Sequence, residues 1–233
     1  MSGAPGVLRV RPPKAILFDF DGTFADTAPD LAFAANQLRA AHGLDHLPLS
    51  AYRPHVSRGG RGMVWVGFGK APGDPDFITL RDAFLAYYAE RLCVDTRFFD
   101  GIDGFISTIE SRGIAWGIVT NKATRYTTPI VQTLGLHQRT TCIVSGDTTP
   151  HAKPHPAPLL HAAELLSVEP PNCWYIGDDE RDIQAARAAG MPGIVADWGY
   201  LGGTDPAHWQ ADARAASPAA LLAMVESTLK SSA

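Results

Sequence analysis

Short runs that are apolar at every position recur along the chain, and turn-forming or acidic residues bound them. Such runs are typical of strands that a parallel sheet buries on both faces, whereas a strand with one exposed face alternates between apolar and polar positions. The predicted strands cover residues 15–18, 114–119, 142–144, 174–176, 193–196 and 211–215.

Helical patterns of apolar residues separate most of these strands. Gly113, Gly135 and Gly190 stand just beyond three of the patterns, where glycine commonly ends a helix. The alternation of strand and helix predicts βαβ units, and therefore an α/β fold whose parallel sheet has helices on both faces. The predicted helices cover residues 103–111, 127–134, 157–166, 182–189 and 217–230.

The stretch from about Thr27 to Thr96 interrupts this alternation, because it holds helical patterns and no clear strand. About 70 helical residues placed after the first strand predict a small additional unit. We therefore expect a helical cap domain of residues 26–96 on a core domain that is formed by residues 1–25 and 97–233.

Composition narrows the partners but not the activity. The 233 residues are 45% hydrophobic and 19% charged, which is ordinary for a globular protein. Acidic residues outnumber basic ones by 24 to 20 and no basic stripe is visible, so we expect no nucleic-acid partner. No apolar run approaches about 18 residues, and the N-terminal segment lacks the apolar centre of a secretory signal. We expect a cytoplasmic protein that does not cross a membrane.

Two carboxylates directly follow the first predicted strand, in the run Asp19-Phe20-Asp21-Gly22-Thr23. Side chains two apart on an extended segment point the same way and lie roughly 7 Å apart. In open α/β sheets, ligands bind beyond the carboxyl ends of the strands. Two carboxylates there can divide the work of nucleophile and acid or base. An acidic turn without a catalytic role is the alternative interpretation.

Two further segments place phosphate-binding groups after later strands or before helices. Thr120-Asn121-Lys122 ends the second predicted strand and opens a helix, where a hydroxyl and free backbone N–H groups suit a phosphate oxygen. An ordinary helix N-cap explains the same residues equally well. Lys153 precedes a proline at the start of another helix, where it can pair with an anion or remain solvated.

An acidic cluster follows the strand at 174–176, in the run Gly177-Asp178-Asp179-Glu180-Arg181-Asp182. So many carboxylates in one place repel one another unless a positive charge lies among them. Mg²⁺ prefers carboxylate and water oxygens and would relieve the repulsion. The helix dipole explains Glu180 and Asp182 without a metal ion, but it does not explain Asp178, which follows the strand directly.

In this order the segments resemble the four motifs of the haloacid dehalogenase superfamily, and the resemblance extends from residue 15 to residue 230. It implies a Rossmann-like core, and the helical insertion resembles the C1 cap of that superfamily. Asp26, the run 27–31, Gly59-Gly60 and the segment 120–122 resemble the phosphoglycolate phosphatase group. The segments 98–101, 116–122 and 199–200 resemble the related N-acetylmuramic acid 6-phosphate phosphatases.

The resemblance implies a role for each motif residue. Asp19 attacks phosphorus and becomes an aspartyl-phosphate, while Asp21 protonates the leaving oxygen and then activates water. Thr120 and Lys153 hold the phosphoryl oxygens. Mg²⁺ is bound by Asp19, the main-chain carbonyl of Asp21 and Asp178, and Asp182 orients the site from outside that set.

The remaining candidates concern the substrate, which is expected to be a small phosphorylated metabolite. Thr23 and Asn121 are candidate substrate contacts within the motifs, and Gly60 is one in the insertion. Arg58 and Arg61, which flank Gly59-Gly60, are candidates for binding a substrate carboxylate or hydroxyl, although surface arginines are often only solvated. The expected substrate is 2-phosphoglycolate, with N-acetylmuramic acid 6-phosphate or another sugar phosphate as the alternative.

Asp21 favours hydrolysis of a monoester, since the dehalogenases of the superfamily lack this second acid. A phosphonatase needs a lysine in the cap, and Lys70, the one lysine of residues 26–96, lies in a glycine- and proline-rich stretch. A non-catalytic, phospho-accepting regulatory protein is the alternative from a different class. His151 and His155 flank Lys153, and the sequence leaves open whether they contact the substrate.

Overall fold

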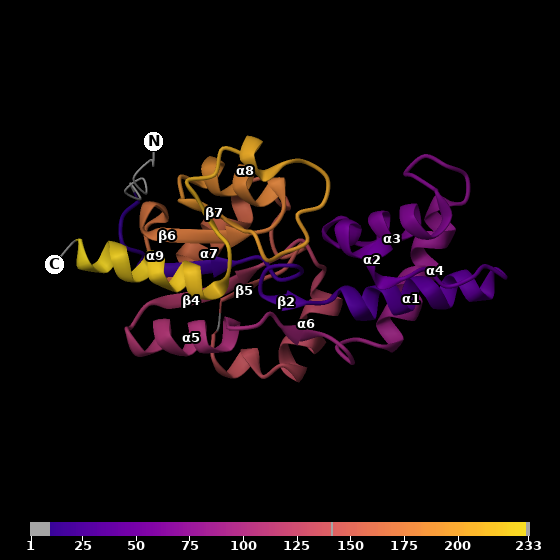
Figure 1. Ribbon diagram of the computed structural model, residues 1–233, viewed down its shortest axis with the longest axis horizontal. Helices are drawn as coiled ribbons and strands as arrows, with labels where there is room; N and C mark the ends of the chain where they lie inside the picture. Colours follow the sequence, from indigo (N-terminus) through magenta and orange to yellow (C-terminus); the bar gives the residue numbers. More distant parts are fainter. Residues whose placement is uncertain (1–9, 141, 232–233) are drawn as a thin grey trace, which may run out of the picture.

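The computed structural model describes residues 10–140 and 142–231, so residues 1–9, 141, 232 and 233 of the expected core domain lie outside the described part. Its centre is a six-stranded sheet in which every neighbouring pair is parallel (Figure 1). This confirms the predicted α/β fold. In spatial order the strands are β5 (Ile143–Val144), β4 (Ala115–Val119), β1 (Ala15–Phe18), β6 (Cys173–Gly177), β7 (Gly193–Ala196) and β8 (Ala213–Ala215).

Successive residues of β1 face two different helical layers, as the pleat of a strand requires. Ala15 and Leu17 pack in the cluster that includes residues of α7 (Ala157–Leu166) and α8 (Glu180–Ala189). Ile16 and Phe18 belong to the cluster that includes residues of α5 (Ile102–Ser111), α6 (Thr124–Thr133) and α9 (Pro218–Lys230). All four residues of β1 are buried, which explains why its sequence is apolar throughout.

Four helices and a 3₁₀ turn form the insertion after the first strand, at the right of Figure 1. Its presence confirms the predicted helical cap. The division at residues 26 and 97 stays a prediction. The elements of the insertion are α1 (Ala28–Ala41), α2 (Leu49–Tyr52), the 3₁₀ turn η1 (Arg53–Arg58), α3 (Gly59–Phe68) and α4 (Phe77–Glu90).

A two-stranded ribbon joins the insertion to the core. Its strands are β2 (Ala25–Asp26) and β3 (Arg97–Phe98), which pair antiparallel. Just beyond the ribbon, the buried carboxylate of Asp30 in α1 accepts hydrogen bonds from the backbone N–H groups of Asp95 and Thr96 at 3.0 and 2.9 Å. The two chain segments that connect insertion and core are therefore bonded to each other.

The longest helices among the described residues, α1 and α4, have 14 residues each. A span of the hydrocarbon core of a bilayer needs about 20 apolar residues. Within the described ranges, no helix has the length and the apolar character that crossing a membrane requires.

Candidate active site

Three neighbouring strands carry candidate residues at their carboxyl ends. Asp19 follows β1, Thr120 follows β4 and Asp178 follows β6, and β1 lies between the other two strands in the sheet. The chain proceeds from β1 to one side and later returns to the other, so these ends form the crevice where α/β sheets bind ligands. All three side chains are buried. The fold therefore brings together residues that are about 160 positions apart in the chain.

A cluster of buried carboxylates occupies this crevice. Asp19, Asp178 and Asp182 each offer an oxygen, and these oxygens all lie within 4.8 Å of one another. Burial, followed by the negative charges of Asp19 and Asp182, raises the pKa of Asp178 well above its ordinary value. Three hard oxygen donors that repel one another in a buried place have the chemistry of a divalent cation site. The residues present therefore fit a metal ion.

This cluster overlaps the predicted ligand set but does not equal it. Asp19 and Asp178 were predicted as ligands, whereas Asp182 was predicted to orient the site. Asp182 accepts a hydrogen bond from Lys153 Nζ at 2.7 Å and, through its other oxygen, one from the backbone N–H of Asp179 at 3.1 Å. The part of Asp21 in binding the metal ion through its main-chain carbonyl stays a prediction.

Lys153 is the positive charge beside the candidate nucleophile. Its ammonium lies 2.8 Å from Asp19 Oδ1 and 2.7 Å from Asp182 Oδ1. Although burial acts to lower it, the charges of Asp182 and Asp19 raise the pKa of Lys153 above its ordinary value. A lysine held in this way stays charged and can compensate the approach of a phosphate dianion to Asp19.

Asn121 fixes the backbone of Lys153. Its side-chain amide accepts a hydrogen bond from the N–H of Lys153 and donates one to the carbonyl of Lys153, both at 2.9 Å. The Thr120 hydroxyl oxygen accepts a hydrogen bond from the N–H of Lys122 at 3.1 Å. Asn121 was predicted to contact substrate; it lines the cavity above the site, and its amide also positions Lys153.

Asp21, the candidate acid and base, is paired with a lysine that the sequence did not single out. Lys122 Nζ lies 2.8 Å from Asp21 Oδ1, and the Thr27 hydroxyl donates to the same oxygen. Burial acts to lower the pKa of Lys122, but Asp21 and Tyr88 together outweigh it and the pKa is raised. Each of the two motif aspartates after β1 thus has its own lysine.

Asp178 is held from the core and from the insertion. Thr23 donates to its Oδ1 at 2.8 Å, and the backbone N–H of Tyr200 donates to its Oδ2 at 2.9 Å. Ser57 of the insertion reaches the same Oδ2 at 3.4 Å. Thr23 was predicted as a substrate contact. Its hydroxyl is instead used by Asp178, and Thr23 is absent from the residues that line the cavity above the site.

That cavity, of about 570 Å³, lies between the carboxyl edge of the sheet and the insertion. Among its lining residues, Arg58, Gly60 and Arg61 come from the insertion as predicted candidates, and neither arginine has a carboxylate partner within the described residues. His151 and His155 are exposed and outside the lining. The core contributes Asp19, Asp21, Thr120, Lys122 and Lys153, and α4 contributes Arg81, Phe84, Leu85 and Tyr88.

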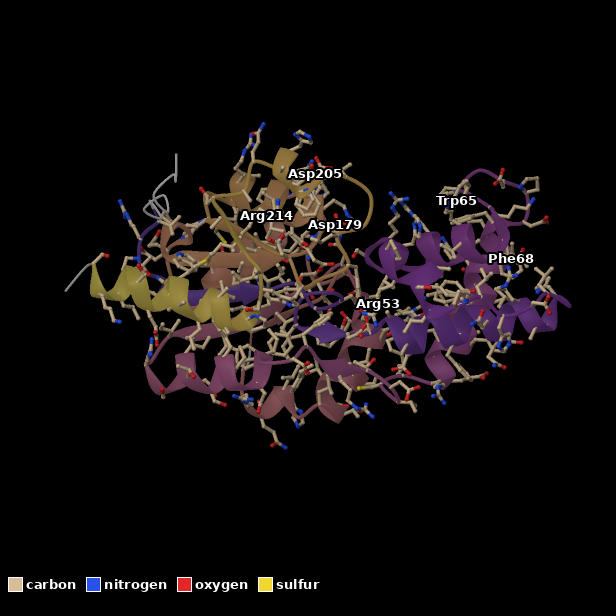
Figure 2. All side chains as sticks on the ribbon, in the orientation of Figure 1. Arg53, Trp65, Phe68, Asp179, Asp205 and Arg214 are labelled. Carbon is tan, nitrogen blue, oxygen red and sulfur yellow. The ribbon has the colours of Figure 1, made fainter. Side chains whose placement is uncertain are left out.

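The junction of core and insertion also carries contacts that the sequence did not reveal. Figure 2 shows Arg53 and Asp179 at this junction. Arg53 pairs with Asp26 at 2.7 Å, where the insertion leaves the core. Arg181 pairs with Asp179 and donates to the backbone carbonyl of Ser57 at 2.6 Å. The acidic motif after β6 is therefore bonded directly to the insertion.

The sheet presents an aspartate paired with a lysine, a second aspartate and an acidic cluster that fits a metal ion, and a helical cap covers them. This arrangement is typical of hydrolases that act on phosphate esters. The model of the haloacid dehalogenase-like hydrolase family matches residues 16–196. The chain belongs to this family.

Its relatives include phosphatases of two kinds. The chain is 43% identical to a phosphoglycolate phosphatase of Xanthomonas campestris pv. campestris strain 8004, over 90% of this chain and 95% of that one. It is 41% identical to an N-acetylmuramic acid 6-phosphate phosphatase of Pseudomonas aeruginosa, over 93% and 96%. The crystal structure of a predicted phosphoglycolate phosphatase from Haemophilus somnus 129pt superposes with a TM-score of 0.79, at 25% identity, over 91% and 98%.

The protein is thus a phosphatase of the haloacid dehalogenase-like family and resembles phosphoglycolate phosphatases. This confirms the predicted enzyme class, hydrolysis of phosphoric monoesters. It does not agree with the alternative of a non-catalytic regulatory protein.

Proposed function

We propose that the protein hydrolyses a small-molecule phosphate monoester through an aspartyl-phosphate on Asp19, with Mg²⁺ as its cofactor, and that 2-phosphoglycolate is its substrate. The observation that carries this proposal is the buried Asp19 carboxylate, 2.8 Å from Lys153 and within the carboxylate cluster below the cavity. The expected site of action is the cytoplasm.

The contacts of Asp19 and Asp21 support a two-step reaction. In the first step a carboxylate oxygen of Asp19 bonds to phosphorus, the bond from phosphorus to the leaving oxygen breaks, and Asp21 gives that oxygen a proton. In the second step Asp21 takes a proton from water as the water attacks phosphorus, and the bond to Asp19 breaks. Lys153 and Thr120 line the cavity where the phosphoryl oxygens would be held.

Mg²⁺, when bound by Asp19, Asp178 and the Asp21 carbonyl, would supply positive charge that offsets the repulsion between carboxylate and phosphate. Asp182 pairs with Lys153 and keeps its ammonium beside Asp19. The protein residues thus orient the nucleophile, while two positive charges compensate the dianion.

The insertion supports a substrate with a second polar or anionic group. Arg58 and Arg61 line the cavity without carboxylate partners within the described residues, and the Xanthomonas relative is a phosphoglycolate phosphatase. The cavity volume favours a second candidate, since about 570 Å³ exceeds what a two-carbon acid fills and lies in the usual range for larger ligands. That candidate is N-acetylmuramic acid 6-phosphate, the substrate named for the Pseudomonas relative.

The test begins with release of phosphate from p-nitrophenyl phosphate by the purified protein, with and without Mg²⁺. We expect Mg²⁺-dependent release that Asp19→Asn abolishes. A protein that releases no phosphate, or that is indistinguishable from Asp19→Asn, refutes the proposal. The ratio of kcat/KM for 2-phosphoglycolate and N-acetylmuramic acid 6-phosphate then decides between the two substrates.

A further inference from the structure

Lys122 lies beside the position that the leaving group must take. This inference rests on the proposed function, in which Asp21 protonates the leaving oxygen. Lys122 Nζ is 2.8 Å from Asp21 Oδ1, so a substrate whose ester oxygen contacts Asp21 also lies near Lys122. Lys153, by contrast, pairs with Asp19 and Asp182. The two lysines therefore stand on different sides of the scissile bond, Lys153 beside the nucleophile and Lys122 beside the leaving group.

The ammonium of Lys122 has donors to spare. It carries three N–H groups, of which one is used by Asp21 and a second faces the Tyr88 hydroxyl, so at least one is left. Its side chain is only 7% exposed, so bulk water does little to screen a further contact. It also lines the cavity. A second anionic oxygen can therefore bind Lys122 while Asp21 remains in place.

Tyr88 of α4 faces the same position from the insertion. Its ring centroid is 5.1 Å from Lys122 Nζ, and it lines the same cavity. Tyr88 is 2% exposed. Its hydroxyl oxygen interacts with the Lys122 ammonium, and its O–H proton has no acceptor among the described residues. A buried O–H donor without an acceptor destabilises the protein, so an anionic oxygen of the substrate is a natural acceptor for it.

Aromatic neighbours keep Tyr88 in this place. Its ring packs on Tyr126 of α6 at 5.5 Å between centroids and is stacked on Phe84 at 6.3 Å. Tyr126 belongs to the core and Phe84 to the insertion, and both line the cavity. The phenol is thus fixed where core and insertion meet, rather than free to turn away.

We propose that Lys122 and Tyr88 form the leaving-group subsite and recognise a carboxylate on the carbon next to the ester oxygen. The substrate class is then a phosphate ester of an α-hydroxy acid. Lys122 pairs with one carboxylate oxygen, and the Tyr88 hydroxyl donates to the carboxylate. An arginine of the insertion can hold the second oxygen. In N-acetylmuramic acid 6-phosphate the carboxylate lies far from the ester oxygen, so this subsite selects against it.

The test is a ratio of two rates measured with Mg²⁺, kcat/KM for 2-phosphoglycolate over kcat/KM for ethyl phosphate. Ethyl phosphate has the same two carbons without the carboxylate. We expect Lys122→Met to lower the ratio by about 30-fold or more, the usual effect of truncating one partner of a buried charge pair. Tyr88→Phe should lower it by about threefold or more, since it removes one hydrogen bond.

Matched controls come from the insertion. Tyr87 is next to Tyr88 on α4, and Lys70 follows α3; neither lines the cavity, so Tyr87→Phe and Lys70→Met should leave the ratio unchanged. Equal losses on both substrates would limit Lys122 to placing Asp21 and would overturn the proposal. A wild-type enzyme that does not prefer 2-phosphoglycolate to ethyl phosphate would overturn it as well.

The test remains decisive if a variant does not fold, and it separates the subsite from the phosphatase activity itself. If Lys122→Met does not fold, Tyr88→Phe decides alone, and an unchanged ratio contradicts the proposal. Hydrolysis of p-nitrophenyl phosphate is measured in parallel. If the wild type hydrolyses it and Asp19→Asn does not, the phosphatase reaction through Asp19 stands, even where Lys122→Met and Tyr88→Phe leave the ratio of kcat/KM values unchanged. Failure of the subsite is thereby separated from failure of the function.

Discussion

At the scale of single residues, each carboxylate of the site acquires its role from its neighbours. Asp19 lies beside Lys153 and within the acidic cluster, which suits a nucleophile that needs positive charge around it. Asp21 lies outside that cluster and is paired with Lys122, so its surroundings differ from those of Asp19. Asp178 is held by Thr23 and the N–H of Tyr200, which fix the orientation of its carboxylate within the cluster.

The first prediction concerns the pH dependence of stability. Burial, with the charges of Asp182 and Asp21 and against that of Lys153, raises the pKa of Asp19 from 3.8 to about 7. The folded protein then binds more protons than the unfolded chain between these values, so the free energy of unfolding falls as pH rises through them. In EDTA, we expect wild type to lose on the order of a few kcal/mol more than Asp19→Asn between about pH 4 and 8.

Urea denaturation of both proteins at several pH values measures this difference. The comparison with Asp19→Asn cancels the contributions of titrating groups that are distant from Asp19. If the free energies of unfolding of the two proteins change in parallel with pH, burial does not raise the pKa of Asp19. The same holds if the wild type gains stability relative to Asp19→Asn as pH rises.

The second prediction concerns Gly22, which has a φ of +90° and where a Cβ would lie 2.3 Å from Asp178 Oδ2. We expect Gly22→Ala to lower the free energy of unfolding by about 2–4 kcal/mol and to weaken Mg²⁺ binding. Gly43→Ala is the control, because its φ is +71° but nothing lies within 4 Å of a Cβ there. It should cost about 1 kcal/mol, and equal effects of both changes would refute the steric argument.

At the scale of elements, burial decides what the sequence could reveal. The strands β1, β6 and β7 are buried at every position, so their uniformly apolar runs predicted them to within one or two residues. The strands β2 and β3 have two residues each, too few for any periodic pattern, and they were missed.

The site divides in a similar way. Residues directly after a strand could be predicted, because the strand ends of a parallel sheet meet at one edge. Contacts between distant segments could not. Lys122 and Asp21 are 101 positions apart, and Ser57 and Asp178 are 121 apart, so their pairing follows only from the folded chain. The same holds for Asn121, whose partner Lys153 is 32 positions away.

The third prediction belongs to the insertion. Arg58 lines the cavity and has no carboxylate partner among the described residues, so it is free to bind the substrate. We expect Arg58→Ala to raise KM by about tenfold while lowering kcat less, because ground-state binding is what it provides. Arg125, on α6 and outside the cavity lining, is the control for removal of an arginine. A lower kcat at unchanged KM would remove Arg58 from the binding role.

At the scale of the whole molecule, core and insertion share the acidic site. Ser57 contacts Asp178, and its carbonyl accepts a hydrogen bond from Arg181, so the position of the insertion is coupled to the motif after β6. The Asp26–Arg53 pair and the short ribbon complete this junction. Closure of the insertion over the cavity would exclude water while the phosphoryl group is transferred.

The fourth prediction is that Mg²⁺ stabilises the entire fold, since the acidic cluster lies at the centre of this junction. At a concentration of about 100 times its dissociation constant, Mg²⁺ should add about 2.7 kcal/mol to the free energy of unfolding. Asp178→Asn should abolish the gain, and Asp205→Asn, a change at an exposed residue shown in Figure 2, should preserve it. A gain that survives in Asp178→Asn would place the ion elsewhere.

Trapping the covalent intermediate tests most directly whether Asp19 is the nucleophile. Enzyme mixed with substrate and Mg²⁺ is quenched in the steady state and treated with borohydride, which reduces an aspartyl-phosphate to homoserine, and the modified residue is located by peptide mass spectrometry. If Asp19 is the nucleophile, homoserine is found at position 19, and only when substrate is present. Modification at any other residue would contradict this role of Asp19. So would an Asp19→Asn variant that hydrolyses substrate at the rate of the wild type.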